Sequence, residues 1–370
     1  MPTPKPGVAH PHLRPNALGL TLRDYEGAPS TLCAGCGHDS ITAGIVRAFY
    51  ELDTPPHMIA KLSGIGCSSK TPTYFVAGAH GFNSAHGRMP SIATGANAAN
   101  RDLTYIGISG DGDSLSIGIG QLAHAVRRNL DMVYVVENNG VYGLTKGQFS
   151  ATADKGSKSK RGLTNTDSAI DMTAMAMQLG ATFVARSFSG DKAQLVPLLK
   201  AAITHHGASF IDVISPCVAF NNHLGSTKSF DFVREHNEAV NRLDFITTRA
   251  PIHVDYEPGT VEVVTQHDGT SLRLRKVAAD YDVHDRISAM NYLQERQAAG
   301  GTPPLHDTAH RLFPILNHAG EVVTGLLYLE PEAADLHDYL NTVETSFNAL
   351  GEDELVPGAQ ALEKFNQSLR

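Results

Sequence analysis

Short apolar runs alternate with amphipathic stretches along the first two thirds of the chain. Few polar residues interrupt the runs, which is typical of strands buried on both faces of a parallel sheet. The expected strands are residues 57–66, 103–109, 132–138, 182–188 and 209–215. The stretches with helical spacing are 40–52 (behind a possible cap at Asp39 or Ser40), 91–100, 114–129, 170–180 and 191–206. The alternation predicts a doubly wound α/β domain with a mainly parallel sheet, and ligands beyond the carboxyl ends of its strands.

The pattern changes after about residue 225. Residues 261–277 carry a turn signal at Asp268-Gly269, which predicts a β-hairpin. "GGTPP" at 300–304 is a breaker, and residues 331–350 are acidic with helical spacing. We therefore divide the chain into an N-terminal arm (1–27), an α/β domain (28–224) and a C-terminal extension (225–370).

Composition excludes several classes of protein. The chain has 370 residues, 42% of them hydrophobic, and a formal net charge of -8, which argues against a nucleic-acid or membrane surface. No apolar run approaches the ~20 residues of a membrane span. The N-terminus is rich in proline and lacks an apolar signal core, so we expect a cytoplasmic protein. Four cysteines are too few and too scattered for a secreted disulfide framework.

Two polar turns follow neighbouring expected strands. Gly110-Asp111-Gly112 comes after one strand and Asn138-Asn139 after the next, so a right-handed crossover places both turns at one sheet edge. Asp111, the amide of Asn139 and a loop carbonyl such as that of Val141 can then share a divalent cation. Mg²⁺ prefers such oxygen ligands and usually completes its octahedron with phosphate oxygens and water. Gly112 lets the backbone approach the phosphates, and the following helix N-terminus favours an anion.

This GDG-to-NN pattern resembles the thiamine diphosphate motif. The alternative is a pair of unrelated surface turns. "GIGQLA" at 118–123 fits a dinucleotide-binding pattern, but it lies inside an expected helix and lacks the strand–turn–helix context. "GSTK" at 225–228 is too short for a phosphate-binding loop. A basic run is either a solvated loop or a contact for an anionic substrate or partner; it comprises Lys155, Lys158, Lys160 and Arg161.

The cysteines stand at positions 33, 36, 67 and 217. A zinc ribbon would need a second C-x-x-C pair, and a redox dithiol would leave Cys67 and Cys217 unused. All four fit the Cys₄ ligation of a [4Fe–4S] cluster. Buried structural cysteines remain the alternative. Thiamine diphosphate and a one-electron acceptor in one chain would imply oxidative decarboxylation of a 2-oxo acid with export of electrons.

The chain resembles the β subunits of 2-oxoacid:ferredoxin oxidoreductases, most closely the 2-oxoglutarate (2-oxoglutarate synthase) subgroup. The resembling stretches are "CAGCGH", "SGIGCSSKTPTYF", "AHGRMPSIATG", "GDGDSLSIGIGQLAHAVRRN", "ENNGVYGLTKGQ" and "ISPC", spanning residues 33 to 217. The last third is similar only loosely. The neighbourhoods of "SSKTPTYF" and "FDFVREH" favour 2-oxoglutarate as the substrate.

The resemblance implies roles for particular residues. The expected cluster ligands are Cys33, Cys36, Cys67 and Cys217, and the expected Mg²⁺ ligands are Asp111, Asn139 and the carbonyl of Val141. The expected thiamine diphosphate contacts are Ile65, Gly66, Cys67, Ser68, His86, Gly112, Asp113, Gly143 and Leu144. Lys70 would pair with the substrate carboxylate, and Leu144 would also form a wall of the substrate pocket. His38 would support the cysteines and would not bind metal.

The resemblance also implies an activity and partners. The reaction would be the reversible, coenzyme A-dependent conversion of 2-oxoglutarate to succinyl-CoA and CO₂ with reduction of ferredoxin. The glutamate that activates thiamine diphosphate would come from an α subunit, in an αβ heterodimer or a dimer of heterodimers. The alternatives are a broad-specificity or pyruvate enzyme, a non-redox thiamine diphosphate decarboxylase or synthase, and a cofactor-free scaffold subunit.

Overall fold

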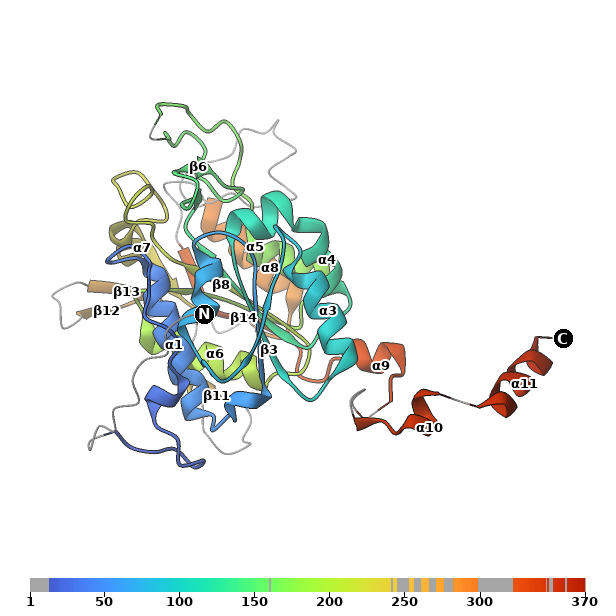
Figure 1. Cartoon of the computed structure of the whole chain (residues 1–370). Coiled ribbons are helices and arrows are strands. Elements are labelled where there is room, and N and C mark those ends of the chain that lie inside the picture. The colour runs from blue at the N-terminus through green and yellow to red at the C-terminus, as the bar shows by residue number, and fades with distance from the viewer. Residues whose placement is uncertain are drawn as a thin grey trace.

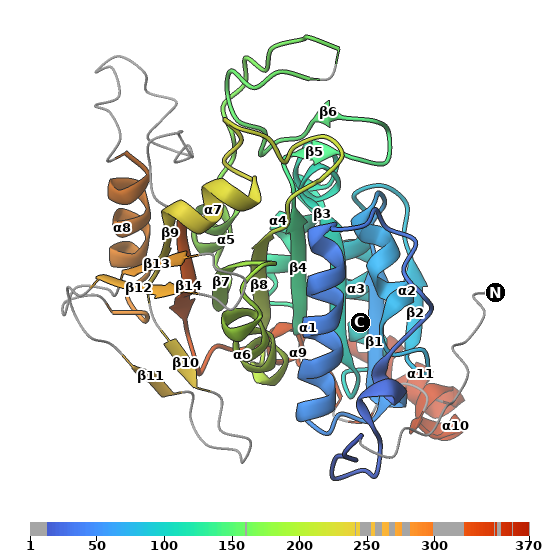
Figure 2. The same cartoon turned by 90° about the vertical axis from the view of Figure 1, so that its left-hand side faces the viewer.

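A computed structural model describes residues 13–159, 161–240, 242–244, 253–255, 261–265, 271–275, 282–298, 322–343, 345, 349–356 and 358–369. Its centre is an eight-stranded sheet in the order β2-β1-β3-β4-β8-β7-β14-β9 (Figures 1 and 2). The strands are β1 (Ile59–Ser63), β2 (His80–Asn83), β3 (Thr104–Gly110), β4 (Met132–Asn138), β7 (Phe183–Phe188), β8 (Ala208–Ile214), β9 (Asn237–Ala239) and β14 (Val322–Leu329). Pairing is parallel from β2 through to β7, which confirms the expected fold class.

Helices cover both faces of the sheet (Figures 1 and 2). One apolar core lies under α3 (Met89–Ala99), α4 (Ile119–Arg127), α5 (Met172–Leu179) and α8 (Arg286–Ala298). The other lies under α1 (Gly37–Glu51) and α6 (Lys192–Thr204). Along β3, Tyr105 belongs to the first core, whereas Ile106 and Ile108 belong to the second. Burial on both faces explains why the strand sequences are continuously apolar.

Two expected helix starts need correction. Helix α1 begins at Gly37, with Cys36 as its N-cap residue, and not behind Asp39 or Ser40. The reason is tertiary, because the Gly37 N–H donates to Pro216 O at 3.4 Å and a side chain there would lie 2.5 Å from Ser215 Oγ. The stretch expected as one helix from Ser114 forms a π-helical turn, Gly112–Ile117, before α4. Such turns are common at functional sites.

The C-terminal third adds to the same sheet. Strand β14 pairs antiparallel with β7, and β9 pairs parallel with β14. Strands β12 (Val261–Thr265) and β13 (Ser271–Arg275) pair antiparallel, which confirms the hairpin, although its turn lies outside the described residues, as does "GGTPP". The further elements here are α7 (Phe230–His236), β10 (Arg242–Asp244), β11 (His253–Asp255), α9 (Leu336–Leu340), α10 (Glu352–Leu355) and α11 (Ala359–Ser368). In Figure 1, α10 and α11 project away from the rest of the chain.

Short elements complete the N-terminal part. They are the 3-10 turns Leu22–Tyr25, Pro56–Met58 and Ser68–Lys70, helix α2 (Thr71–Tyr74), and strands β5 (Val141–Tyr142) and β6 (Gln148–Phe149). Tyr25 is fully buried and donates to Thr54 O at 2.9 Å, so this part of the arm packs on the domain. None of the helices in the described ranges is long and apolar enough to cross a membrane.

Arg186 of β7 forms a buried ion network with Asp171 and Asp212. The Arg186 side chain is 1% exposed and donates to Asp212 at 2.8 Å and to Asp171 at 2.7 Å. We expect Arg186→Met to lower the free energy of unfolding by about 3–5 kcal/mol, because two buried carboxylates lose their cation. The matched control is Arg47→Met, whose pair with Glu51 is exposed, and this should cost less than about 1 kcal/mol. Denaturant unfolding measures both, and equal losses would contradict the argument.

Candidate functional site

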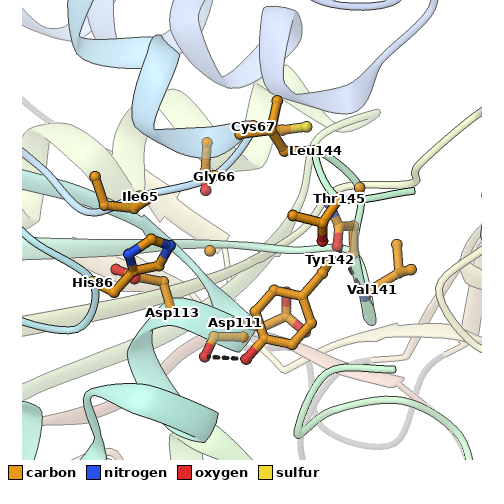
Figure 3. Close-up of a pocket in the computed structure, with 15 residues that line it drawn as sticks. Ile65, Gly66, Cys67, His86, Asp111, Asp113, Val141, Tyr142, Leu144 and Thr145 are labelled. Atoms are coloured by element: carbon orange, nitrogen blue, oxygen red, sulfur yellow. Dashed lines mark hydrogen bonds between the residues drawn. The ribbon is translucent and has the colours of Figure 1, made fainter. Parts of the chain in front are cut away.

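A pocket opens at the carboxyl ends of β1, β3 and β4, where a doubly wound sheet binds ligands (Figure 3). Its volume is about 470 Å³, including space open to solvent. The lining residues are Ile65, Gly66, Cys67, Ser68, His86, Gly110, Asp111, Gly112, Asp113, Asn139, Val141, Tyr142, Gly143, Leu144 and Thr145. The pocket therefore brings together every residue that the sequence assigned to thiamine diphosphate or Mg²⁺; the individual roles stay predictions.

Asp111 is the buried carboxylate of this pocket. Its side chain is 1% exposed and accepts hydrogen bonds from Ser150 Oγ and, at 2.5 Å, from Thr152 Oγ1. Burial raises its pKa, while the two hydroxyls, the charge of Lys228 and a hydrogen bond from the Asn139 backbone act in the opposite direction. An ionised carboxylate here lacks sufficient positive charge, which a divalent cation would supply.

Only one of the paired asparagines faces the pocket. Asn138 is turned into the protein, where its Nδ2 donates to Asp212 at 3.0 Å and its Oδ1 accepts from Thr152 at 2.8 Å. Asn139 lines the pocket, and its Oδ1 accepts from the Val141 N–H at 3.0 Å. This contact tightens the turn that carries two of the three expected Mg²⁺ ligands, Asn139 and Val141.

Asp113 lines the pocket, but its carboxylate is used internally. One oxygen accepts from the Gly87 N–H and the other from Ser109 Oγ, each at 2.9 Å. Gly87 has φ +65°, and a side chain there would lie 2.7 Å from the Gly118 backbone. Asp113 thus fixes the loop that carries His86 against the π-helical turn.

Gly112 has no room for a side chain. A Cβ there would lie 2.5 Å from the ring of Tyr142, whose hydroxyl donates to Gly112 O at 3.0 Å. We expect Gly112→Ala to destabilise the fold by about 1–3 kcal/mol through overpacking. The loss should shrink in a Tyr142→Ala background, where the ring is absent.

A glycine in open space provides the control for that prediction. Gly120 lies in α4, and a Cβ there would meet nothing within 4 Å. Gly120→Ala should stabilise the fold by up to about 1 kcal/mol, because alanine favours the helix. Thermal or denaturant unfolding compares the variants, and a loss at Gly112 that is unchanged without the ring would refute the clash.

The four cysteines converge beside the pocket. All are free thiols, and Cys67 lines the pocket itself. A Cβ at Gly143 would lie 3.3 Å from Cys67 Sγ and 3.6 Å from Cys217 Sγ, so both sulfurs face this glycine. The Cys36 N–H donates to Cys33 O at 3.0 Å, which closes the C-x-x-C turn. Figure 3 shows Cys67 on the side of the pocket opposite Asp111 and Tyr142.

Three of the cysteine thiols favour their protonated form in the absence of metal. Burial raises the pKa of Cys36 to about 12, and burial also raises the pKa values of Cys67 and Cys217. Among the described residues, no three His, Cys, Asp or Glu side chains are arranged to hold a single metal ion. A four-iron cluster takes one thiolate per iron and so needs wider spacing, and its iron would supply the charge that thiolates lack here.

Lys70 and His38 lie outside the pocket lining. Lys70 is partly exposed three residues after Cys67, and its N–H donates to Cys67 O at 3.1 Å. His38 is buried, with Nδ1 2.6 Å from Ser215 Oγ and 3.5 Å from Glu137, and burial lowers its pKa to about 4. A neutral, internally bonded imidazole is consistent with support for the cysteine loop.

The remaining motifs considered in the sequence do not line the pocket. "GIGQLA" lies largely in α4, which leaves the dinucleotide pattern without its required turn. Lys228 of "GSTK" is fully buried, 3.5 Å from Asp154. Lys155, Lys158 and Arg161 are exposed on a loop, whereas Lys160 lies outside the described residues. Sequence reasoning missed Tyr142 and Thr145, which stand within a quoted motif, and Ser150 and Thr152, which carry no motif signal.

Comparisons with known proteins bear on this site. Residues 64–213 match the family model described as the thiamine pyrophosphate enzyme, C-terminal TPP binding domain. Among solved structures, the chain is similar to the 2-oxoglutarate:ferredoxin oxidoreductase from Magnetococcus marinus with 2-oxoglutarate, coenzyme A and succinyl-CoA bound. That match has a TM-score of 0.67 and 28% identity, and it covers 89% of this chain and 91% of the other.

Curated relatives agree with one another. The chain is 34% identical to the 2-oxoglutarate synthase subunit KorB of Methanocaldococcus jannaschii, covering 58% of this chain and 80% of the relative. It is 44% identical to the 2-oxoacid:ferredoxin oxidoreductase 1 subunit beta of Aeropyrum pernix, covering 52% and 60%, respectively. It is 40% identical to the 2-oxoglutarate oxidoreductase subunit KorB of Mycobacterium tuberculosis, covering 55% and 53%. The match spans less than two thirds of the last two relatives. The chain belongs to the family of 2-oxoacid:ferredoxin oxidoreductase β subunits.

Proposed function

We propose that this chain is the β subunit of a thiamine diphosphate- and [4Fe–4S]-dependent 2-oxoglutarate:ferredoxin oxidoreductase. Its reaction is the reversible, coenzyme A-dependent conversion of 2-oxoglutarate to succinyl-CoA and CO₂ with reduction of ferredoxin. The observation that carries the proposal is that one cysteine takes part in both the pocket and the cysteine site. Cys67 lines the pocket that holds Asp111 and Asn139, and it also faces Cys217 across Gly143.

The pocket residues fit Mg²⁺ and a diphosphate. Asp111 and Asn139 offer a carboxylate and an amide oxygen on adjoining loops, and Val141 offers a backbone carbonyl. Gly112 lines the pocket at the start of the π-helical turn, and the N-terminal end of a helix favours an anion. When bound, thiamine diphosphate supplies the electron-accepting centre through which a 2-oxo acid loses CO₂. The chain would hold and orient this cofactor through these residues.

The cysteines fit an iron–sulfur cluster by chemistry and position. The sulfurs of Cys67 and Cys217 both face Gly143, and the partly buried thiols of Cys36, Cys67 and Cys217 resist ionisation without metal. A cluster held by these cysteines would accept electrons singly, and Cys67 lines the cofactor pocket. Cys67 therefore belongs to both sites.

The substrate needs a cation and an apolar wall. Lys70, whose backbone N–H donates to Cys67 O, would pair with the 2-oxo acid carboxylate. Leu144 is 53% exposed at the pocket and would bound the substrate side chain. The similarity to the Methanocaldococcus, Mycobacterium and Magnetococcus proteins, which are named for 2-oxoglutarate, favours 2-oxoglutarate. The name of the Aeropyrum protein supports a broader 2-oxoacid enzyme as the runner-up.

The active site requires a second subunit. No glutamate stands among the described residues that line the pocket, so the group that activates the aminopyrimidine must come from elsewhere. An α subunit would supply it, in an αβ heterodimer or a dimer of heterodimers. Ferredoxin would receive the electrons.

Anaerobic co-purification with a partner subunit, followed by a panel of 2-oxo acids with coenzyme A and a viologen dye, tests the proposal. We expect a brown enzyme that reduces the dye fastest with 2-oxoglutarate. Fastest reduction with pyruvate would support the runner-up. CO₂ release without dye reduction from a colourless enzyme would support a non-redox decarboxylase, and binding of a partner without thiamine diphosphate would support a scaffold.

A further inference from the structure

A tight turn after β8 connects the cysteine site to the expected cation loop. Cys217 O accepts the Phe220 N–H at 3.2 Å and the Asn221 N–H at 2.9 Å. The Asn221 side chain is 8% exposed, and its Nδ2 donates to the backbone oxygen of Asn139 at 2.8 Å. One residue thus bonds the backbone of an expected cluster ligand and the backbone of an expected Mg²⁺ ligand.

The backbone of the turn after Asn139 leaves space for the Asn221 amide. Gly140 has φ +72°, a left-handed conformation that favours glycine. A Cβ there would lie 2.6 Å from Asn221 Nδ2 and 3.3 Å from Lys228 Cγ. The amide and the lysine stem therefore occupy the space behind the turn, and a shift of Asn221 would release the backbone that positions Asn139 and Val141.

The same turn touches the other loops of both sites. Val218 Cγ1 lies 3.7 Å from where a Cβ of Gly35 would stand, in the C-x-x-C loop. The Phe220 ring lies 2.9 Å from the corresponding position at Gly147, which follows Leu144 and Thr145. A change in the position of Cys217 would therefore reach the cofactor pocket through direct contacts.

We propose that Asn221 is a positioning residue that couples occupancy of the four-cysteine site to binding of Mg²⁺ and thiamine diphosphate. Filling the cysteine site restrains Cys217, and Asn221 passes this restraint to the Asn139 turn. Binding at the two sites is then mutually favourable, because coupling between sites is reciprocal. This inference rests on the proposed function.

The test is equilibrium binding of thiamine diphosphate with Mg²⁺ to the enzyme purified with its partner subunit. It is measured with the cluster intact and after anaerobic removal of the cluster by a chelator. In the wild type we expect affinity to be about tenfold higher with the cluster, a moderate coupling between sites. In Asn221→Ala the ratio should fall to below about twofold, with iron content unchanged at first isolation.

Two further variants make the result specific. Asn221→Leu keeps the side-chain volume and loses the donor, so it should also lose the coupling if the alanine variant folds poorly. Asn222→Ala removes the neighbouring exposed amide, which accepts from the Phe230 N–H, and should keep the wild-type ratio.

The outcomes separate this inference from the proposed function. Equal wild-type affinities with and without the cluster would overturn the coupling, as would Asn221 variants that weaken both affinities equally and keep the ratio. Absence of thiamine diphosphate binding in every form of the wild type would overturn the proposed function itself.

Discussion

Asp111→Asn should abolish Mg²⁺-dependent binding of thiamine diphosphate while leaving the metal-free fold at least as stable as the wild type. The loss of affinity should be at least about 100-fold, because even the residues that orient metal ligands contribute about 10–100-fold. Asparagine keeps the shape of the side chain, and the hydroxyls of Ser150 and Thr152 can still hydrogen-bond it. Binding isotherms with varied Mg²⁺ measure the effect.

Asp111→Asn should weaken cofactor binding, but near neutral pH it should raise the free energy of unfolding of the metal-free protein. Burial raises the pKa of Asp111, so the folded chain holds this proton to higher pH than the unfolded chain does. The metal-free wild type should therefore lose stability as pH rises from the ordinary carboxyl range through the raised pKa. Asp111→Asn removes that loss. The free energies of unfolding of wild type and variant, plotted against pH, should therefore meet at low pH and separate near neutrality.

The control for this pair of measurements is Asp102→Asn, at an exposed carboxylate away from the pocket. It should change neither affinity nor the pH dependence of unfolding in chelator. Retained Mg²⁺-dependent binding in Asp111→Asn would place the cation elsewhere. A metal-free variant less stable than the wild type at neutral pH would mean that Asp111 is a structural carboxylate.

The sequence predicted that Asp111 and Asn139 lie at the same edge of the sheet, because the order of the strands alone determines this. Each residue follows a buried strand, and β3 and β4 are parallel neighbours, so their carboxyl ends share an edge. The structure adds that the neighbouring Asn138 turns inward to Asp212.

The supporting groups could not be predicted in this way. Thr152 reaches Asp111 across 41 positions, from a loop that has no periodicity. Asn221 lies 82 positions from Asn139, and its role depends on the path of the chain after Cys217. The place of β14 between β7 and β9 was equally inaccessible, because the sequence of a strand carries no local signal of its partners.

Cys36 has two expected roles, as a cluster ligand and as the N-cap residue of α1, and a single substitution should affect them in opposite directions. It is an expected cluster ligand, and it is the N-cap residue of the 15-residue helix α1. Its backbone is extended there, with ψ 134°, and its side chain makes no capping hydrogen bond. Serine is among the best N-cap residues because its oxygen accepts from an N–H in the first turn, whereas it is a poor substitute for a thiolate at iron.

We therefore expect Cys36→Ser to lose most of its iron and sulfide while its cluster-free fold becomes more stable by about 0.5–1 kcal/mol. Cys33→Ser is the matched control, since Cys33 is exposed and stands outside the helix, and it should lose iron without gaining stability. Iron and sulfide analysis, visible absorbance and denaturant unfolding of the apo forms measure these effects. Full iron content in Cys36→Ser would remove Cys36 from the ligand set. Equal apo stabilities of the two variants would instead refute the capping argument, because only residue 36 stands where a hydroxyl can bond the first turn of α1.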